Sequence, residues 1–374
     1  MSRRVTYLLL LLTLLAGARA HARRVAGITG IFGDDRRITY VGRTVAENHA
    51  VSFDWTGTYM RIAFEGTELR MRCSDSGRDW LNVWLDKEMS AEPDSVIVLH
   101  GDTVVTLFAD SRKHAKPAVH QVIVQKRTEG EQGRLCVKEL LVRGELLPAE
   151  PLKERYIEFI GDSYTCGFGA EKSVSSDPFT PATETAAKSY AAILARAFDA
   201  DYVLVAHSGM GVCRNYNSKF AGRYMPDRYQ QAFDMDTASL WTPDKDGQKP
   251  SLTVIMLGGN DFSTGFVPEY ENFERHYMQL LTAVKRAYGE EHPVLCCTKK
   301  GNRQLAEYVR RVTDNCGMEQ VYFATCFESL YHDDDRELGA CSHPNYKAHC
   351  KMACNLLPYI ATITGWNMPD KKSE

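Results

Sequence analysis

The sequence predicts two domains: an all-β, jelly-roll-like sandwich, followed by a three-layer α/β/α domain with a parallel sheet. The chain has 374 residues, which is more than one typical domain needs. Upstream of residue 150 its apolar residues recur with a period of two, as in strands with one buried face. Downstream, short apolar runs alternate with helical periodicity, which is typical of a parallel sheet covered by helices.

The front domain, residues 21–150, is predicted from short strands with no convincing helix between them. Between Tyr59 and Cys73, apolar residues take even positions up to Phe64 and odd positions from Leu69, so we expect a hairpin turning at Glu65–Thr67. Further strand-like runs follow at WLNVWLD, SVIVLHG, TVVTLFA, HQVIVQK and LCVKELLVRG. An all-β sandwich accounts for this pattern most simply.

The second domain, residues 151–370, begins after LLPAEP, whose two prolines predict a linker. Its predicted strands are residues 156–160, 202–206, 252–257, 294–297 and 321–324. Helical periodicity fills the intervals, at residues 189–198, 272–288, 302–312 and 345–363. Ligands of such sheets bind at the carboxyl ends of the strands, so functional residues are expected there.

Residues 1–20 are predicted to be a signal peptide. A positive start at Arg3 and Arg4 precedes an apolar run, Tyr7–Leu15, and an A-x-A motif ends at Ala20. The run is about half of the roughly 20 residues that a membrane span needs. We therefore expect a secreted or periplasmic protein with no membrane span after cleavage.

Composition argues against several other classes of protein. The net charge is −3 and no stripe of Lys or Arg is present, so nucleic acid is not an expected partner. The 11 cysteines are odd in number, and several, such as Cys136, Cys296 and Cys326, lie in apolar segments, which favours buried, reduced thiols. Because no Cys-x2-Cys pair or His/Cys cluster has zinc spacing, we expect no metal ion, and no cofactor.

Four polar or glycine-rich stretches follow the predicted strands or precede the last helix. GDS after the first strand contains Ser163, HSGMG after the second contains Gly209, GGND after the third contains Asn260, and CSHP before the last helix contains His343. Each stretch alone is a common loop. Their order and spacing over residues 153–368 resemble those of the SGNH, or GDSL, hydrolases.

That resemblance implies serine esterase chemistry. Ser163 would be the nucleophile, with His343 as the base that takes its proton and later returns it to the leaving alcohol. The oxyanion would be held by the backbone N–H groups of Ser163 and Gly209 and by the side-chain amide of Asn260. His343 is expected to titrate near the reference pKa of about 6.5, and activity to rise with pH through it.

One departure concerns the acid that usually orients the histidine. The superfamily has an aspartate three residues before the histidine, and here that residue is Ala340. Either a backbone carbonyl near Cys341 or Ser342 holds the ring, or a carboxylate such as Asp335 or Glu337 does so. We expect the carbonyl, because any acceptor for the Nδ1–H selects the productive tautomer.

Three other polar residues near these motifs are assigned structural roles. Asp162 and Asp261 lie next to candidate site residues, but an ionised carboxylate cannot donate to an oxyanion, so both are predicted to organise loops. His349 falls inside the last predicted helix and is expected to be structural.

VGRTV and FDWTGTYMRIAFEGTEL in the front domain, joined to the second domain, resemble carbohydrate esterase family 2. That resemblance implies removal of O-acetyl groups from xylan- or glucomannan-type polysaccharides or oligosaccharides, and some members lack the aspartate. The family's aromatic residue before the histidine is Ser342 here. Two alternatives stay open: a non-catalytic carbohydrate-binding or adhesion protein, in which the β-sandwich of residues 21–150 binds the carbohydrate, and a lipase or thioesterase for longer acyl chains.

Overall fold

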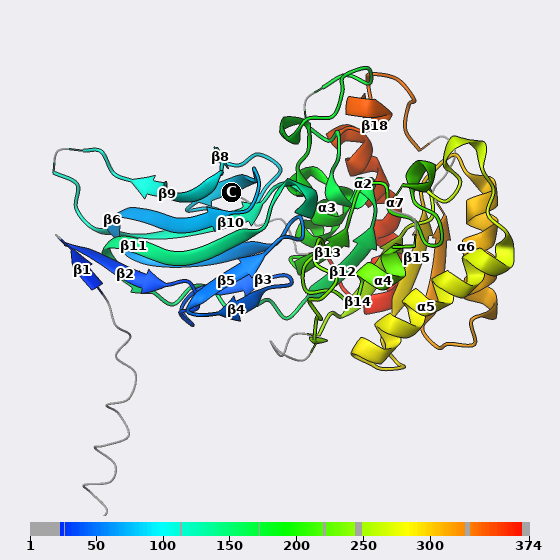
Figure 1. The fold of residues 1–374 in the computed structure, drawn as a ribbon, viewed down its shortest axis with the longest axis horizontal. Helices are drawn as coiled ribbons and strands as arrows, with labels where there is room; N and C mark the ends of the chain where they lie inside the picture. The colour runs from blue at the N-terminus through cyan, green and yellow to red at the C-terminus, as the bar shows by residue number, and fades with distance from the viewer. Residues whose placement is uncertain are drawn as a thin grey trace, which may run out of the picture.

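The structure is a computed structural model that describes residues 23–25, 27–112, 114–171, 173–219, 222–243, 249–325 and 330–368. An antiparallel β-domain lies beside a domain with a parallel sheet and helices, which confirms the predicted fold class (Figure 1). The expected signal peptide and Cys326 lie outside the described residues. Among the helices that are described, none has the length and apolar character needed to cross a membrane.

The front domain is an eleven-stranded antiparallel sheet that folds around one hydrophobic cluster. Its longest strands, β6 and β11, pair with each other along most of their length. The later strands match the predicted runs, whereas the short strands β1 to β5 were not predicted. The strands are β1 (Arg23–Val25), β2 (Ile28–Phe32), β3 (Thr39–Val41), β4 (Val45–Glu47), β5 (Ala50–Phe53), β6 (Tyr59–Asp75), β7 (Trp80–Leu85), β8 (Ser95–Val98), β9 (Gly101–Ala109), β10 (Ala118–Lys126) and β11 (Leu135–Leu147).

The predicted hairpin between Tyr59 and Cys73 is wrong, because β6 runs straight through Glu65–Thr67. The change from even to odd buried positions comes from a β-bulge, where the register with β11 shifts between Arg143 and Gly144. A bulge adds one residue to one strand and so reverses the phase of the alternation without a turn. Beyond the bulge β6 changes partner from β10 to β9.

The second domain has a five-stranded parallel sheet in the order β13-β12-β14-β15-β16. Its strands, which match the predicted ones to within a residue at each end, are β12 (Tyr156–Gly161), β13 (Asp201–Ala206), β14 (Leu252–Met256), β15 (Val294–Thr298) and β16 (Val321–Thr325). The helices are α2 (Ser163–Cys166), α3 (Tyr190–Ala197), α4 (Met225–Arg228), α5 (Tyr270–Tyr288), α6 (Arg303–Asn315) and α7 (Tyr346–Thr364). A short antiparallel pair, β17 (Leu338–Gly339) and β18 (His343–Pro344), precedes α7.

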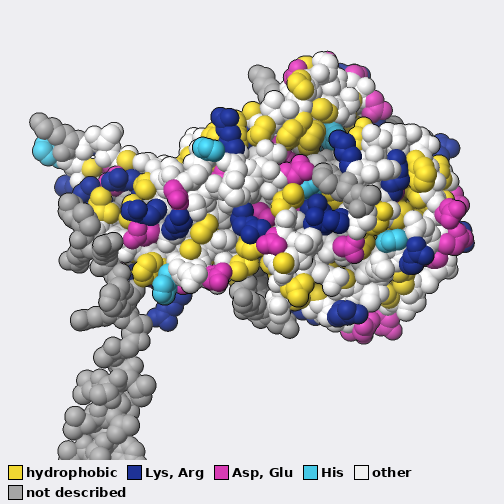
Figure 2. Space-filling model, viewed as in Figure 1, with side chains coloured by type: hydrophobic (Ala, Val, Ile, Leu, Met, Phe, Trp, Pro, Cys, Tyr) yellow, Lys and Arg dark blue, Asp and Glu magenta, His cyan; other side chains and the backbone are white. Residues whose placement is uncertain are grey.

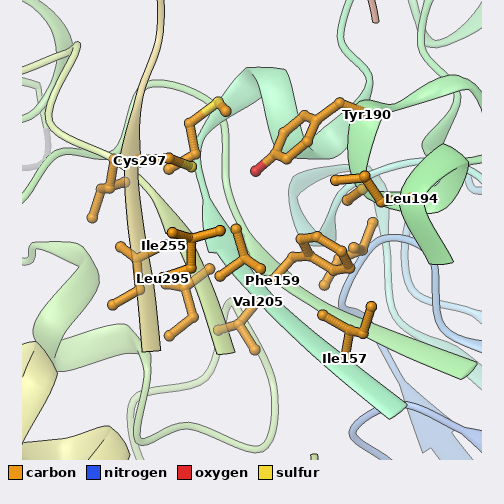
Figure 3. Close-up of a cluster of buried hydrophobic side chains, with 14 of the residues drawn as sticks. Ile157, Phe159, Tyr190, Leu194, Val205, Ile255, Leu295 and Cys297 are labelled. Carbon is orange, nitrogen blue, oxygen red and sulfur yellow. The ribbon is translucent and has the colours of Figure 1, made fainter. Parts of the chain in front are cut away.

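Helices cover the parallel sheet, so its first four strands are buried at every position. This burial on both faces explains why these strands are continuous apolar runs without alternation. Phe159 of β12 and Val205 of β13 lie in one cluster with Tyr190 and Leu194 of α3 (Figure 3). No disulfide joins any two of the ten cysteines among the described residues.

The two domains share this core. Trp55 and Trp84 of the front domain are fully buried in the same hydrophobic cluster as the parallel sheet. Gly57 approaches β13 so closely that a Cβ there would lie 2.7 Å from Leu204 Cδ1. The Tyr59 hydroxyl donates to Asp201 at 2.6 Å. The front domain is therefore packed directly against the sheet that carries the candidate site.

Candidate active site

Ser163 lies where β12 ends and the single-turn helix α2 begins. Gly161 is required there, because a Cβ would lie 2.0 Å from the Thr165 hydroxyl oxygen. The Asp162 carboxylate caps α2 by accepting from the Tyr164 N–H at 3.1 Å. This tight strand-to-helix turn presents the Ser163 hydroxyl at the carboxyl edge of the sheet, although only 7% of the residue is exposed.

His343 comes to Ser163 from the other end of the domain. Its Nε2 lies 2.8 Å from Ser163 Oγ, and its Nδ1 lies 3.1 Å from the Cys341 carbonyl oxygen. Because a carbonyl only accepts, Nδ1 carries the proton and Nε2 is free to accept from the serine. Cys341 and Ser342 both have positive φ, 53° and 56°, in the turn that aims this carbonyl.

The alternative carboxylates have other partners. Asp335 accepts from the backbone N–H of Ser175 at 2.9 Å. Glu337 pairs with Lys351 at 2.7 Å and accepts from the His332 N–H at 2.6 Å. Of the arrangements open from sequence, the structure therefore contains the carbonyl dyad.

Asp335→Asn and Glu337→Gln are each expected to keep kcat within about threefold of the unsubstituted chain, because neither carboxylate contacts the imidazole. Changing a triad aspartate to its amide can reduce kcat about 10⁴-fold by selecting the wrong tautomer. Steady-state hydrolysis of p-nitrophenyl acetate by each variant gives its kcat and distinguishes a threefold change from a 10⁴-fold loss. A collapse of kcat in either variant would identify a triad acid and refute the dyad.

The three expected oxyanion donors lie in three adjacent loops. Gly209 follows β13 with a φ of 79°, a left-handed conformation that glycine adopts without strain. Within the residues described, neither its N–H nor that of Ser163 donates to a protein acceptor. The Asn260 amide donates to Asp162 at 3.1 Å and to the Met210 carbonyl at 2.8 Å, so an oxyanion has to share one of these hydrogens.

The residues expected to be structural have structural contacts. Asp261 accepts from the N–H groups of Val212, Cys213 and Arg214 at 2.7 to 2.9 Å, and so shapes the loop after Gly209. Its burial raises its pKa to about 6. His349 is fully buried and accepts from the Tyr190 N–H at 3.2 Å. 

Aromatic rings enclose the histidine. Phe168 lies 4.4 Å from His343 between ring centroids and stacks on Phe179 at 4.2 Å. Tyr164 meets the imidazole edge-on at 5.6 Å, and the Lys299 ammonium lies 4.7 Å from the Tyr164 ring centroid. These residues were not predicted from the sequence. Phe168 could have been noticed because it follows Ser163 by five residues, whereas the position of Lys299 depends on the fold.

This enclosure lowers the pKa of His343 to about 4, since burial disfavours the charged ring. The Cys341 carbonyl raises the pKa and Lys299 lowers it. The expected pKa of about 6.5 is therefore too high for the folded protein.

If the neutral ring acts as the base, as the sequence predicts, kcat/KM is expected to rise with pH around pH 4 and to be level above about pH 6. Removing the positive charge of Lys299 favours the imidazolium and so raises the pKa of His343. Lys299→Met should therefore move the midpoint of the kcat/KM–pH profile to higher pH. Lys300→Met is the matched control, because Lys300 pairs with Asp333 at 2.9 Å instead. A midpoint near 6.5 in the unsubstituted chain would contradict the lowered pKa.

Comparisons with known proteins agree with this geometry. Residues 40–151 match the family described as carbohydrate esterase 2 N-terminal, and residues 159–349 match the GDSL-like lipase/acylhydrolase family. Cellulase/esterase CelE of Acetivibrio thermocellus is 32% identical over 89% of this chain, which spans 40% of the length of CelE. An acetylxylan esterase/glucomannan deacetylase of Cellvibrio japonicus is 27% identical, over 90% of this chain and 91% of its own.

Solved structures give the same relationship. A family two carbohydrate esterase from Clostridium thermocellum, in complex with cellohexaose, is 30% identical with a TM-score of 0.78, over 88% of this chain and 100% of its own. A family two carbohydrate esterase from Cellvibrio japonicus is 25% identical with a TM-score of 0.80, over 91% of this chain and 98% of its own. These matches confirm the resemblance drawn from the motifs. The chain belongs to family 2 of the carbohydrate esterases, which are carboxylic ester hydrolases of the GDSL type.

Proposed function

We propose that the chain is a secreted or periplasmic serine esterase that removes O-acetyl groups from xylan- or glucomannan-type polysaccharides. The observation that carries the proposal is the Ser163–His343 contact of 2.8 Å, with the imidazole oriented by the Cys341 carbonyl. A neutral imidazole bonded to a serine hydroxyl can activate it as a nucleophile. Export depends on the signal peptide expected at residues 1–20.

Acylation begins when His343 Nε2 takes the proton of Ser163 Oγ as that oxygen bonds to the acetyl carbonyl carbon. The carbonyl oxygen becomes an oxyanion, for which the N–H groups of Ser163 and Gly209 have no competing protein acceptor among the described residues. The intermediate then expels the sugar oxygen, which takes the proton from Nε2. The free sugar hydroxyl leaves, and the acetyl group stays on Ser163.

Deacylation repeats these steps with water. His343 takes a proton from the water as its oxygen bonds to the acetyl carbon, and the second tetrahedral intermediate uses the same donors. Its collapse breaks the bond to Ser163 Oγ, which recovers the proton from Nε2. Acetate is released and the resting dyad is restored, without a metal ion or cofactor in either step.

Two observations support a polysaccharide as the alcohol part of the ester. The related Cellvibrio japonicus enzyme is named for xylan and glucomannan, and the Clostridium thermocellum enzyme binds cellohexaose. In this chain Phe179 stacks on Phe168, which in turn packs on His343, whereas Ser342 provides no ring. Hydrophobic side chains also gather on the surface over the loops near β18 (Figure 2). Sugar rings stack on aromatic faces, so we place the backbone of the polysaccharide there.

The test is acetate release from acetylated xylan and acetylated glucomannan, with p-nitrophenyl acetate, butyrate and octanoate as reporters of acyl length. We expect acetate release from at least one polysaccharide, and acetate to be the best reporter. A preference for octanoate would favour a lipase or thioesterase. Hydrolysis of no ester, with retention on an insoluble polysaccharide, would favour the non-catalytic binding protein.

A further inference from the structure

We propose that Glu129, a residue of the front domain, is a positioning residue for the oxyanion loop of the catalytic domain. Its Oε2 accepts from the backbone N–H of Ser208 at 2.5 Å, and its Oε1 accepts from the Ser208 hydroxyl. Ser208 directly precedes Gly209, so one carboxylate holds the residue before the proposed oxyanion donor by two bonds. The inference rests on the proposed function, because it requires Gly209 to be that donor.

The loop needs such a restraint because its key residue is a glycine. Glycine has the widest conformational freedom of all residues, so the direction of the Gly209 N–H depends on what fixes its neighbours. On one side the Glu129 carboxylate holds Ser208. On the other side the Gly209 carbonyl accepts from the Tyr216 N–H at 2.7 Å. Preorganised donors are effective because they need no rearrangement when the oxyanion forms.

The loop that carries Glu129 is itself fixed on the catalytic domain. Glu129 is only 4% exposed, and its carbonyl accepts from the buried Lys126 ammonium at 2.9 Å. Gly130 lies so close to the second domain that a Cβ there would be 2.6 Å from Asp234 Oδ2. Asp234 in turn pairs at 2.6 Å with His207, which precedes Ser208. Both ends of the contact are therefore held within a buried polar cluster.

A second buried carboxyl group lies beside this contact. Glu129, Glu184 and Cys166 have polar atoms within 4.8 Å of one another. Burial, and then the nearby Glu129, raise the pKa of Glu184 well above its usual range. Since Cys166 lies three residues after Ser163 on α2, the same cluster borders the helix of the nucleophile.

The experiment compares Glu129→Gln with Glu131→Gln in the full chain, using p-nitrophenyl acetate. Glu131 is the matched control, because it lies in the same loop and its carboxylate reaches His207 Nε2 only at 3.5 Å. We expect Glu129→Gln to lower kcat about 10-fold to 100-fold with KM within about twofold, as for a displaced catalytic group. Glu131→Gln should keep both constants within about twofold. Thermal unfolding of each variant monitors the fold.

Several outcomes would overturn the inference: unchanged kcat in a folded Glu129→Gln variant, an equal loss in Glu131→Gln, or a change in KM alone. If Glu129→Gln does not fold, Ser208→Ala decides, because it removes only the hydroxyl donor; unchanged kcat then refutes the positioning role. Loss of kcat on dialysis against EDTA would also refute it, because Glu129 would then be a metal ligand. If the unsubstituted chain hydrolyses no ester, the proposed function itself fails, and this result is distinct from the others.

Discussion

Ser163→Ala is expected to abolish ester hydrolysis while the chain stays folded. Its hydroxyl is the group that His343 Nε2 contacts, at 2.8 Å, and in the proposed mechanism this oxygen carries the acetyl group, which no water can do in its place. Loss of the nucleophile of a serine hydrolase can lower kcat about 10⁶-fold. Release of p-nitrophenol from its acetate ester measures the loss of hydrolysis, and thermal melting followed by circular dichroism measures whether the fold is kept.

The matched control is Ser175→Ala in the neighbouring loop. The Ser175 hydroxyl donates to Asp335 and not to His343, so this variant should keep its turnover. The stability of Ser163→Ala should be close to that of the unsubstituted chain, since the hydroxyl makes no bond that α2 requires. Wild-type turnover in Ser163→Ala would refute the nucleophile assignment and, with it, the acetyl-enzyme.

Asn260→Ala is expected to lower kcat about 100-fold to 1000-fold with little change in KM, as removal of one oxyanion donor typically does. The Asn260 amide donates to both the Asp162 carboxylate and the Met210 carbonyl, and so links the two loops. Alanine removes the oxyanion donor and both of these hydrogen bonds. Because the oxyanion forms only during reaction, binding of the ground-state ester should be unaffected. Steady-state kinetics with p-nitrophenyl acetate separate the two constants.

Two companion variants sharpen this prediction. Asn260→Asp keeps the shape but, when ionised, cannot donate, so its kcat should fall at least as far as that of alanine. Gly209→Val places a β-branched residue at a φ of 79°, which distorts the other donor, and kcat should fall there also. A change confined to KM in these variants would contradict the oxyanion role.

Most of the catalytic domain was predictable because its strands are buried on both faces and end at distinctive residues. β12 ends at Gly161, directly before Asp162 and Ser163. A change from an apolar run to glycine and polar residues marks the end of a strand in the sequence. The short strands β1 to β5 were missed because segments of three to five residues contain too little alternation. The wrong hairpin at Glu65–Thr67 arose because a bulge and a turn change the phase of the pattern in the same way.

The candidate site was predictable as far as it depends on strand ends. The proximity of Ser163 and His343 follows from the parallel topology together with the family motif order. The contact of Glu129 with Ser208 does not, because it depends on how two domains dock, and periodicity contains no such information. The stack of Phe168 and Phe179 likewise depends on the path of a long loop.

The group that orients His343 belongs to the main chain, and this affects which mutations the enzyme tolerates. A triad aspartate is lost by a single codon change, whereas every amino acid at position 341 retains a carbonyl oxygen. Only a change that redirects the backbone would remove the acceptor, such as proline or a β-branched residue, because neither fits the φ of 53° found there. Within that limit the side chain at position 341 can vary while the acceptor for the Nδ1–H is kept.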